Sequence, residues 1–153
     1  MVLRALALSA AGLLATSGSA PAKNLGELAT LLAPAFLAQQ LAGLCASYDP
    51  GFIAETSGPW GSAHDFAQHV KDEISVVLSR DEVLLVLRGA AGVARDTAQA
   101  ELRALSARTA KEEAERVGQW CSGPAKAYVR AVVNEHEAGH EGFERAINQA
   151  LME

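Results

Sequence analysis

The chain has 153 residues, of which half are hydrophobic and a fifth are charged, and its formal net charge is −5 at pH 7. Its 13 lysines and arginines are scattered and form no basic stripe. Because binding to a phosphate backbone or an anionic lipid surface depends on clustered positive charge, we expect neither nucleic acid nor a charged membrane surface as a partner.

The first 22 residues have the organisation of a secretory signal. Arg4 precedes an apolar run over 5–15, and residues 20–22 have the small-x-small form of a cleavage site. The apolar run is shorter than the ~20 residues that a bilayer-spanning helix needs, and we find no longer apolar segment after it. We therefore expect an exported protein, periplasmic or secreted, with no membrane span and with one helical domain over 23–153.

The chain contains only two cysteines, Cys45 and Cys121. An even number of cysteines in an exported chain favours a disulfide, here one that closes a long loop and stabilises the fold by about 4 kcal/mol in the chain-entropy model. The alternative is that both thiolates bind a metal. The disulfide is favoured because neither cysteine lies near a histidine in the sequence.

The remaining elements are predicted as helices separated by turn signals. A first helix begins near Pro34 and continues to Tyr48, and 54–62 reads as a loop because of its glycines and proline. Capping patterns beginning at Ser62, Ser79 and Thr109 then precede three amphipathic runs. These signals predict an all-α fold, a small bundle of four to five helices stapled by one disulfide.

Apolar runs at 74–78 and 83–87 could form the two strands of a hairpin, but no Asn-Gly or Asp-Gly turn joins them, so helix is favoured. Residues 122–124 are expected to end one helix, and Pro124 is expected to begin the last one, which runs to about residue 151.

Two histidines stand on the apolar face of the last predicted helix. With a rotation of roughly 100° per residue and Val129 at zero, His136 and His140 fall at roughly −20° and +20°. They share this face with five apolar residues: Val132, Val133, Phe143, Ile147 and Leu151. Since an unpartnered buried polar group costs roughly 1–3 kcal/mol, both imidazoles need partners inside the protein.

His69 and Glu73 flank the inward face of the helix that follows Ser62. Imidazoles and carboxylates from facing helices of a bundle can form a metal site, so His69, Glu73, His136 and His140 are candidate ligands for zinc or copper. The alternative is that the histidines are structural and are hydrogen-bonded by neighbouring carboxylates or tyrosines. Sequence alone does not establish that the two helices are neighbours.

The segment His136-Glu137-Ala138-Gly139-His140 resembles the H-E-x-x-H motif of the zincin metallopeptidases. The resemblance implies two zinc-binding histidines, with Glu137 as the general base that activates a zinc-bound water. The chain departs from the family in its context. Only 13 residues follow His140, so a downstream third ligand has little room, and no β-sheet is predicted beside the helix.

The sequence therefore favours a small exported binding or interaction protein that is not an enzyme. Its partner is expected to be a protein of the cell envelope, and the inward histidine pair is a candidate transition-metal site. The second hypothesis is a zinc-dependent peptidase that uses Glu137 as its base. Small stapled helical domains do not require catalysis, because function resides in the site and not in the fold.

Overall fold

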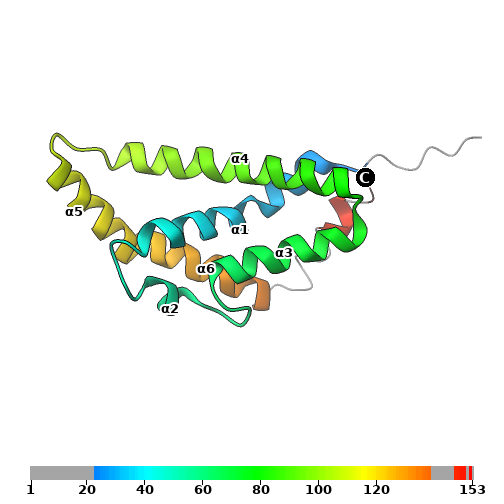
Figure 1. Ribbon diagram of the computed structural model, residues 1–153, viewed down its shortest axis with the longest axis horizontal. Helices are drawn as coiled ribbons and strands as arrows, with labels where there is room; N and C mark the ends of the chain where they lie inside the picture. Colours follow the sequence, from blue (N-terminus) through cyan, green and yellow to red (C-terminus); the bar gives the residue numbers. More distant parts are fainter. Residues whose placement is uncertain (1–22, 139–146, 151, 153) are drawn as a thin grey trace, which may run out of the picture.

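The computed structural model describes residues 23–138, 147–150 and 152, with only the backbone described at 135–138 (Figure 1). The expected signal segment and His140 lie outside the described residues.

The described chain is entirely helical in its regular structure, so the predicted all-α bundle is confirmed. The elements are α1 (Leu25–Cys45), α2 (Phe52–Thr56), α3 (Ala63–Val77), α4 (Arg80–Ala104), α5 (Ala110–Trp120), the π-helical turn η1 (Cys121–Ala125) and α6 (Lys126–Ala138). The described residues thus form six α-helices, where four to five were expected, because the five-residue helix α2 lies partly within the predicted loop.

The hairpin alternative at 74–87 is wrong. Residues 74–77 end α3 and residues 83–87 lie within α4. At the start of α4, the Ser79 hydroxyl accepts a hydrogen bond from the Glu82 N–H, and the Glu82 carboxylate accepts one from the Ser79 N–H. This reciprocal capping box satisfies backbone groups that a helix start leaves open, so the polar residues between the apolar runs begin a helix instead of turning a hairpin.

Helix α1 begins nine residues before the predicted start. Asn24 caps it by accepting a hydrogen bond from the Glu27 N–H at 3.1 Å, and Pro34 lies inside the helix. Proline cannot donate the helical hydrogen bond to the carbonyl four residues earlier, here that of Thr30. Both Pro34 and Thr30 are exposed, so water can reach that carbonyl and the helix continues.

The expectation that no segment after the signal is long and apolar enough to span a membrane also needs correction. Helix α1 has 21 residues and a mean hydropathy of 1.5, which meets that criterion by length and composition. In the structure 56% of this segment is buried within the protein. A helix that forms the centre of a small bundle needs apolar residues around most of its surface, which gives it the same composition.

The bundle is built around α1, which packs mainly against α4 and also against α3 and α6 (Figure 1). Helices α1 and α4 run in the same direction, since Lys23 pairs with Glu82 near the start of both helices and Ala29 faces Gly89 further along. A Cβ atom on Gly89 would lie 2.9 Å from the Ala29 Cβ. Small residues therefore let these two backbones approach closely.

The prediction that residues 122–124 end one helix and that Pro124 begins the next is wrong. The chain passes from α5 through η1 into α6 without leaving helical geometry. Pro124 has no N–H and so cannot make an α-helical bond to Trp120, and the wider π-turn accommodates its ring. The predicted disulfide is confirmed: Cys121, the first residue of η1, is bonded to Cys45 at the end of α1.

Candidate binding site at the junction of α3 and α6

A tight turn at 58–61 precedes α3 and contacts α6, the two helices that carry residues of the predicted site. Gly58 and Gly61 form an isolated antiparallel bridge, with hydrogen bonds of 2.9 and 3.0 Å in both directions. Gly61 has a φ of +89°, a conformation that favours glycine. A Cβ on Gly58 would lie 2.7 Å from the Val133 Cγ1 atom, so the turn is pressed directly against α6.

The same turn carries Trp60 over His69 of α3. The two rings are stacked with centroids 3.9 Å apart and an angle of 13° between their planes. One helical turn further on, Glu73 Oε1 lies 3.3 Å from His69 Nε2. The His69 and Glu73 side chains are about a quarter exposed, yet His69 Nε2 and Glu73 Oε2 are shielded from solvent. The stack fixes the ring plane, and the carboxylate lies beside its Nε2.

An ionic cluster holds the preceding segment on α6. Lys126 Nζ donates hydrogen bonds to the carboxylates of Asp49 and Glu55, the latter at 2.9 Å. Arg130 Nε donates to the Glu55 carbonyl oxygen at 2.7 Å. Because the hydrogen bond from Lys126 stabilises the ionised carboxylate, it lowers the pKa of Asp49. These contacts position α2, and through it the 58–61 turn, against α6.

The structure brings the two helices of the predicted site together. His69 and Glu73 lie on α3 beside the turn, and that turn contacts α6 at Val133, three residues before His136. The backbone at His136 and Glu137 belongs to α6, but their side chains lie outside the described part of the structure, as does all of His140. The ligand role of His136 and His140, and the catalytic role of Glu137, therefore stay predictions.

The described residues of the apolar face of the last predicted helix agree with its predicted orientation. Val129 and Val133 are fully buried, and Ile147 is 7% exposed. Burial of the two imidazoles themselves stays a prediction. Among the described residues, no three histidine, cysteine, aspartate or glutamate side chains are close enough to hold a metal ion, so His69 and Glu73 alone would supply at most two ligands.

Sequence reasoning missed Trp60 as part of this site. Its aromatic ring follows Gly58-Pro59 and precedes Gly61, and such a turn can place a side chain on either neighbouring helix. The contact with His69 depends on how α3 packs on α6, which local sequence does not specify. His64, near the start of α3, is not part of this site: it is exposed, and its Nδ1 lies 2.7 Å from Gln39 Nε2 of α1.

Comparison of the chain with protein-family models, curated proteins and solved structures gives no match. The geometry of the site is therefore the basis for the functional argument.

Proposed function

We propose that this is a small exported binding protein, without enzymatic activity, that holds a zinc or copper ion between α3 and α6. His69 and Glu73 supply ligands from α3, His136 supplies one from α6, and His140, four positions further along the sequence, supplies the last. One observation carries the proposal: the 58–61 turn contacts α6 at Val133 while its Trp60 stacks on His69. The α3 pair is thus directed to the same region of the bundle as the segment that contains His136.

The chemistry of these residues suits a borderline transition metal. Neutral imidazole nitrogens bind zinc and copper well, and a carboxylate can complete a four-coordinate site. Glu73 lies one turn from His69 and its Oε1 is 3.3 Å from His69 Nε2, so the two side chains are close enough to share one ion. Trp60 limits the orientations of the His69 ring, which reduces the entropy lost on binding.

Export and an envelope partner belong to the same proposal. The disulfide supports an oxidising compartment, since such bonds persist in secreted and periplasmic proteins and are rare where thiols are kept reduced. The predicted signal over residues 1–22 points the same way. A protein of the cell envelope that delivers or receives the metal is the partner that we expect.

Metal binding can be measured directly. The mature chain, purified without a histidine tag, should bind about one equivalent of zinc or copper in a calorimetric titration. His69→Ala, and separately His136→Ala/His140→Ala, should each weaken binding by at least tenfold or so, because each removes metal ligands. His64→Ala is the matched control and should leave affinity unchanged, since this histidine is exposed and contacts α1.

The proposal would be contradicted if the wild-type protein bound zinc and copper more weakly than micromolar, or if His69→Ala left the metal affinity unchanged. Glu137→Gln separates the binding protein from the zincin-like alternative. If the protein only binds the metal, Glu137→Gln should leave the metal affinity unchanged, and neither wild type nor variant should show peptidase activity. A metal-dependent peptidase activity that disappears in Glu137→Gln would replace our proposal with the catalytic one.

A further inference from the structure

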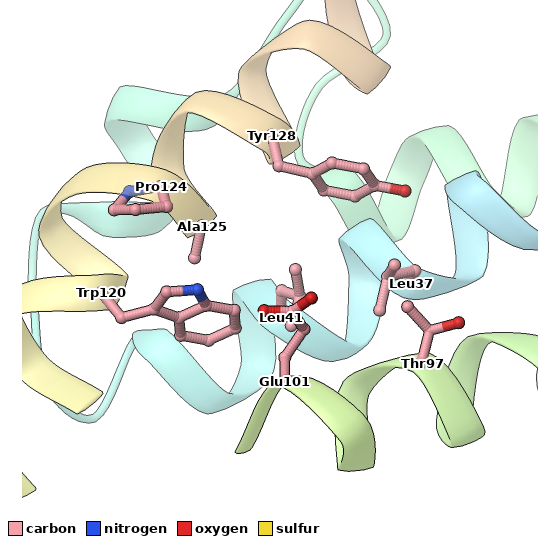
Figure 2. A pocket seen from close by; sticks show the side chains of 8 residues that line it. All are labelled: Leu37, Leu41, Thr97, Glu101, Trp120, Pro124, Ala125 and Tyr128. Carbon is pink, nitrogen blue, oxygen red and sulfur yellow. The ribbon is translucent and has the colours of Figure 1, made fainter. Parts of the chain in front are cut away.

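A second site is a pocket of about 240 Å³ lined by α1, α4 and the segment that runs from α5 into α6 (Figure 2). Its base is formed by Leu37 and Leu41 of α1, and its remaining wall residues come from α4, the end of α5, η1 and α6. Figure 2 shows the Trp120 ring and the Glu101 side chain extending toward the same space, with the Tyr128 ring across from them. The pocket is thus mainly apolar and aromatic, with a carboxylate at one wall.

The π-turn explains why two aromatic residues eight positions apart line one pocket. In an uninterrupted α-helix, Trp120 and Tyr128 would differ by roughly 80° around the axis. A π-turn accommodates one additional residue, so the two behave as if they were seven apart and differ by only ~20°. Pro124 belongs to this turn and itself lines the pocket. Turns of this kind are frequent at functional sites.

The carboxylate of Glu101 gives the pocket its chemical preference. Glu101 takes part in no hydrogen bond or ion pair with the other residues that the structure describes. Aromatic rings attract a cation through their negative faces, and a carboxylate does so through its charge. Trp120, Tyr128 and Glu101 therefore favour the same sign of charge in a ligand, while the two leucines favour an apolar body.

We propose that this pocket binds a small organic ammonium ion, a primary amine attached to an aromatic or short aliphatic group. The ammonium group pairs with Glu101 and lies against an aromatic ring, and the apolar part contacts Leu37 and Leu41. The volume limits the ligand to a small molecule, since pockets for drug-sized ligands measure about 300–1,000 Å³. Nothing in this proposal depends on the metal site between α3 and α6.

The test uses 2-phenylethylammonium as the probe and the two tryptophan indole N–H resonances in NMR as the readout. The Trp120 resonance should shift saturably, whereas that of Trp60, which lies in the 58–61 turn, should not; Trp60→Phe assigns the two signals. Glu101→Gln should weaken binding by about tenfold, because it removes the charge partner and keeps the shape. The neutral analogue 2-phenylethanol should bind more weakly than the ammonium by a similar factor.

Glu115→Gln is the matched control, an exposed carboxylate on α5 outside the pocket, and it should leave affinity unchanged. The proposal is overturned if the Trp120 signal shows no saturable shift at up to about 10 mM probe. It is also overturned if the ammonium and the alcohol bind equally well, or if Glu101→Gln has no effect. The ligand comparison uses the wild-type protein, so it remains decisive if a variant does not fold.

Discussion

Lys126 is the residue whose charge has the clearest structural role. Its side chain is only 13% exposed, and its ammonium group bonds to Asp49 and Glu55 and lies 5.8 Å from the Phe52 ring centroid. The hydrogen bond to Asp49 raises the pKa of Lys126, and the same bond lowers the pKa of Asp49 from its usual 3.8. Both shifts mean that the folded state favours the charged forms.

The sign of each shift defines a pH window for this cluster. The lowered pKa of Asp49 contributes stability above about pH 4, which is lost as the pH falls through the folded-state value. The raised pKa of Lys126 contributes stability that is lost only as the pH rises past about 10.5. We expect Lys126→Met to lower the Tm throughout pH 5–9, with the difference from wild type shrinking below about pH 4.

A matched substitution tests that this pH dependence comes from the cluster. Lys111→Met removes an exposed lysine at the start of α5 and should leave the Tm nearly unchanged over the same range. Thermal unfolding followed by circular dichroism measures all three proteins. A difference between wild type and Lys126→Met that stays constant from pH 7 to pH 2 would contradict the assignment of the stabilisation to ionised Asp49.

At the scale of the elements, most helix starts could be predicted because their signals are local. The reciprocal capping boxes at Ser62 and Ser79 are present, and Thr109 caps α5 by accepting a hydrogen bond from the Glu112 N–H. The misplaced boundaries both involve proline. Pro34 and Pro124 lie inside helical segments, because a solvated carbonyl in one case and a π-turn in the other accommodate the missing N–H.

The packing of α1 on α4 can be tested with two glycines of α4. An alanine at Gly92 would meet nothing within 4 Å, so Gly92→Ala should raise the free energy of unfolding by about 0.5–1 kcal/mol through helix propensity. At Gly89 the added Cβ would lie 2.9 Å from Ala29 Cβ, and the helices must separate slightly. We expect Gly89→Ala to be less stable than Gly92→Ala by at least ~1 kcal/mol.

Urea denaturation of both variants measures this difference, and each variant serves as the control for the other. Both changes have the same intrinsic effect on a helix, so the comparison isolates the contact with Ala29. Equal stability of Gly89→Ala and Gly92→Ala would show that the close approach of α1 and α4 does not limit the size of residue 89.

At the scale of the whole molecule, the sequence indicates which face each helix buries, but it indicates less well which helices pack against each other. The all-α class follows from periodicity and caps, and the Cys45–Cys121 pairing follows from the presence of only two cysteines in a chain with a predicted secretory signal. The proximity of α3 and α6 depends on the 58–61 turn, and the pocket at Trp120 depends on a π-turn. Neither has a local pattern that predicts it, so the proximity of the two helices at the candidate metal site, and the whole pocket at Trp120, emerged only from the fold.

The disulfide is the contact that should affect the stability of the entire fold. It joins two fully buried cysteines 76 positions apart, at the end of α1 and the start of η1. Closing a loop of this length in the unfolded chain corresponds to about 4 kcal/mol in the chain-entropy model. We expect Cys45→Ala/Cys121→Ala to lower the free energy of unfolding by roughly this amount, within the ~2–5 kcal/mol seen when native disulfides are removed.

Urea denaturation supplies a second readout that separates two causes of this loss. Without the cross-link the unfolded chain is more expanded and exposes more surface, so the dependence of the unfolding free energy on urea should become steeper. Val117→Ala, which removes buried atoms near the end of α5 and keeps the cross-link, should lower stability with an unchanged slope. If the double cysteine variant also keeps the wild-type slope, its lost stability comes from packing around the two sulfur atoms and not from the connection of α1 to η1.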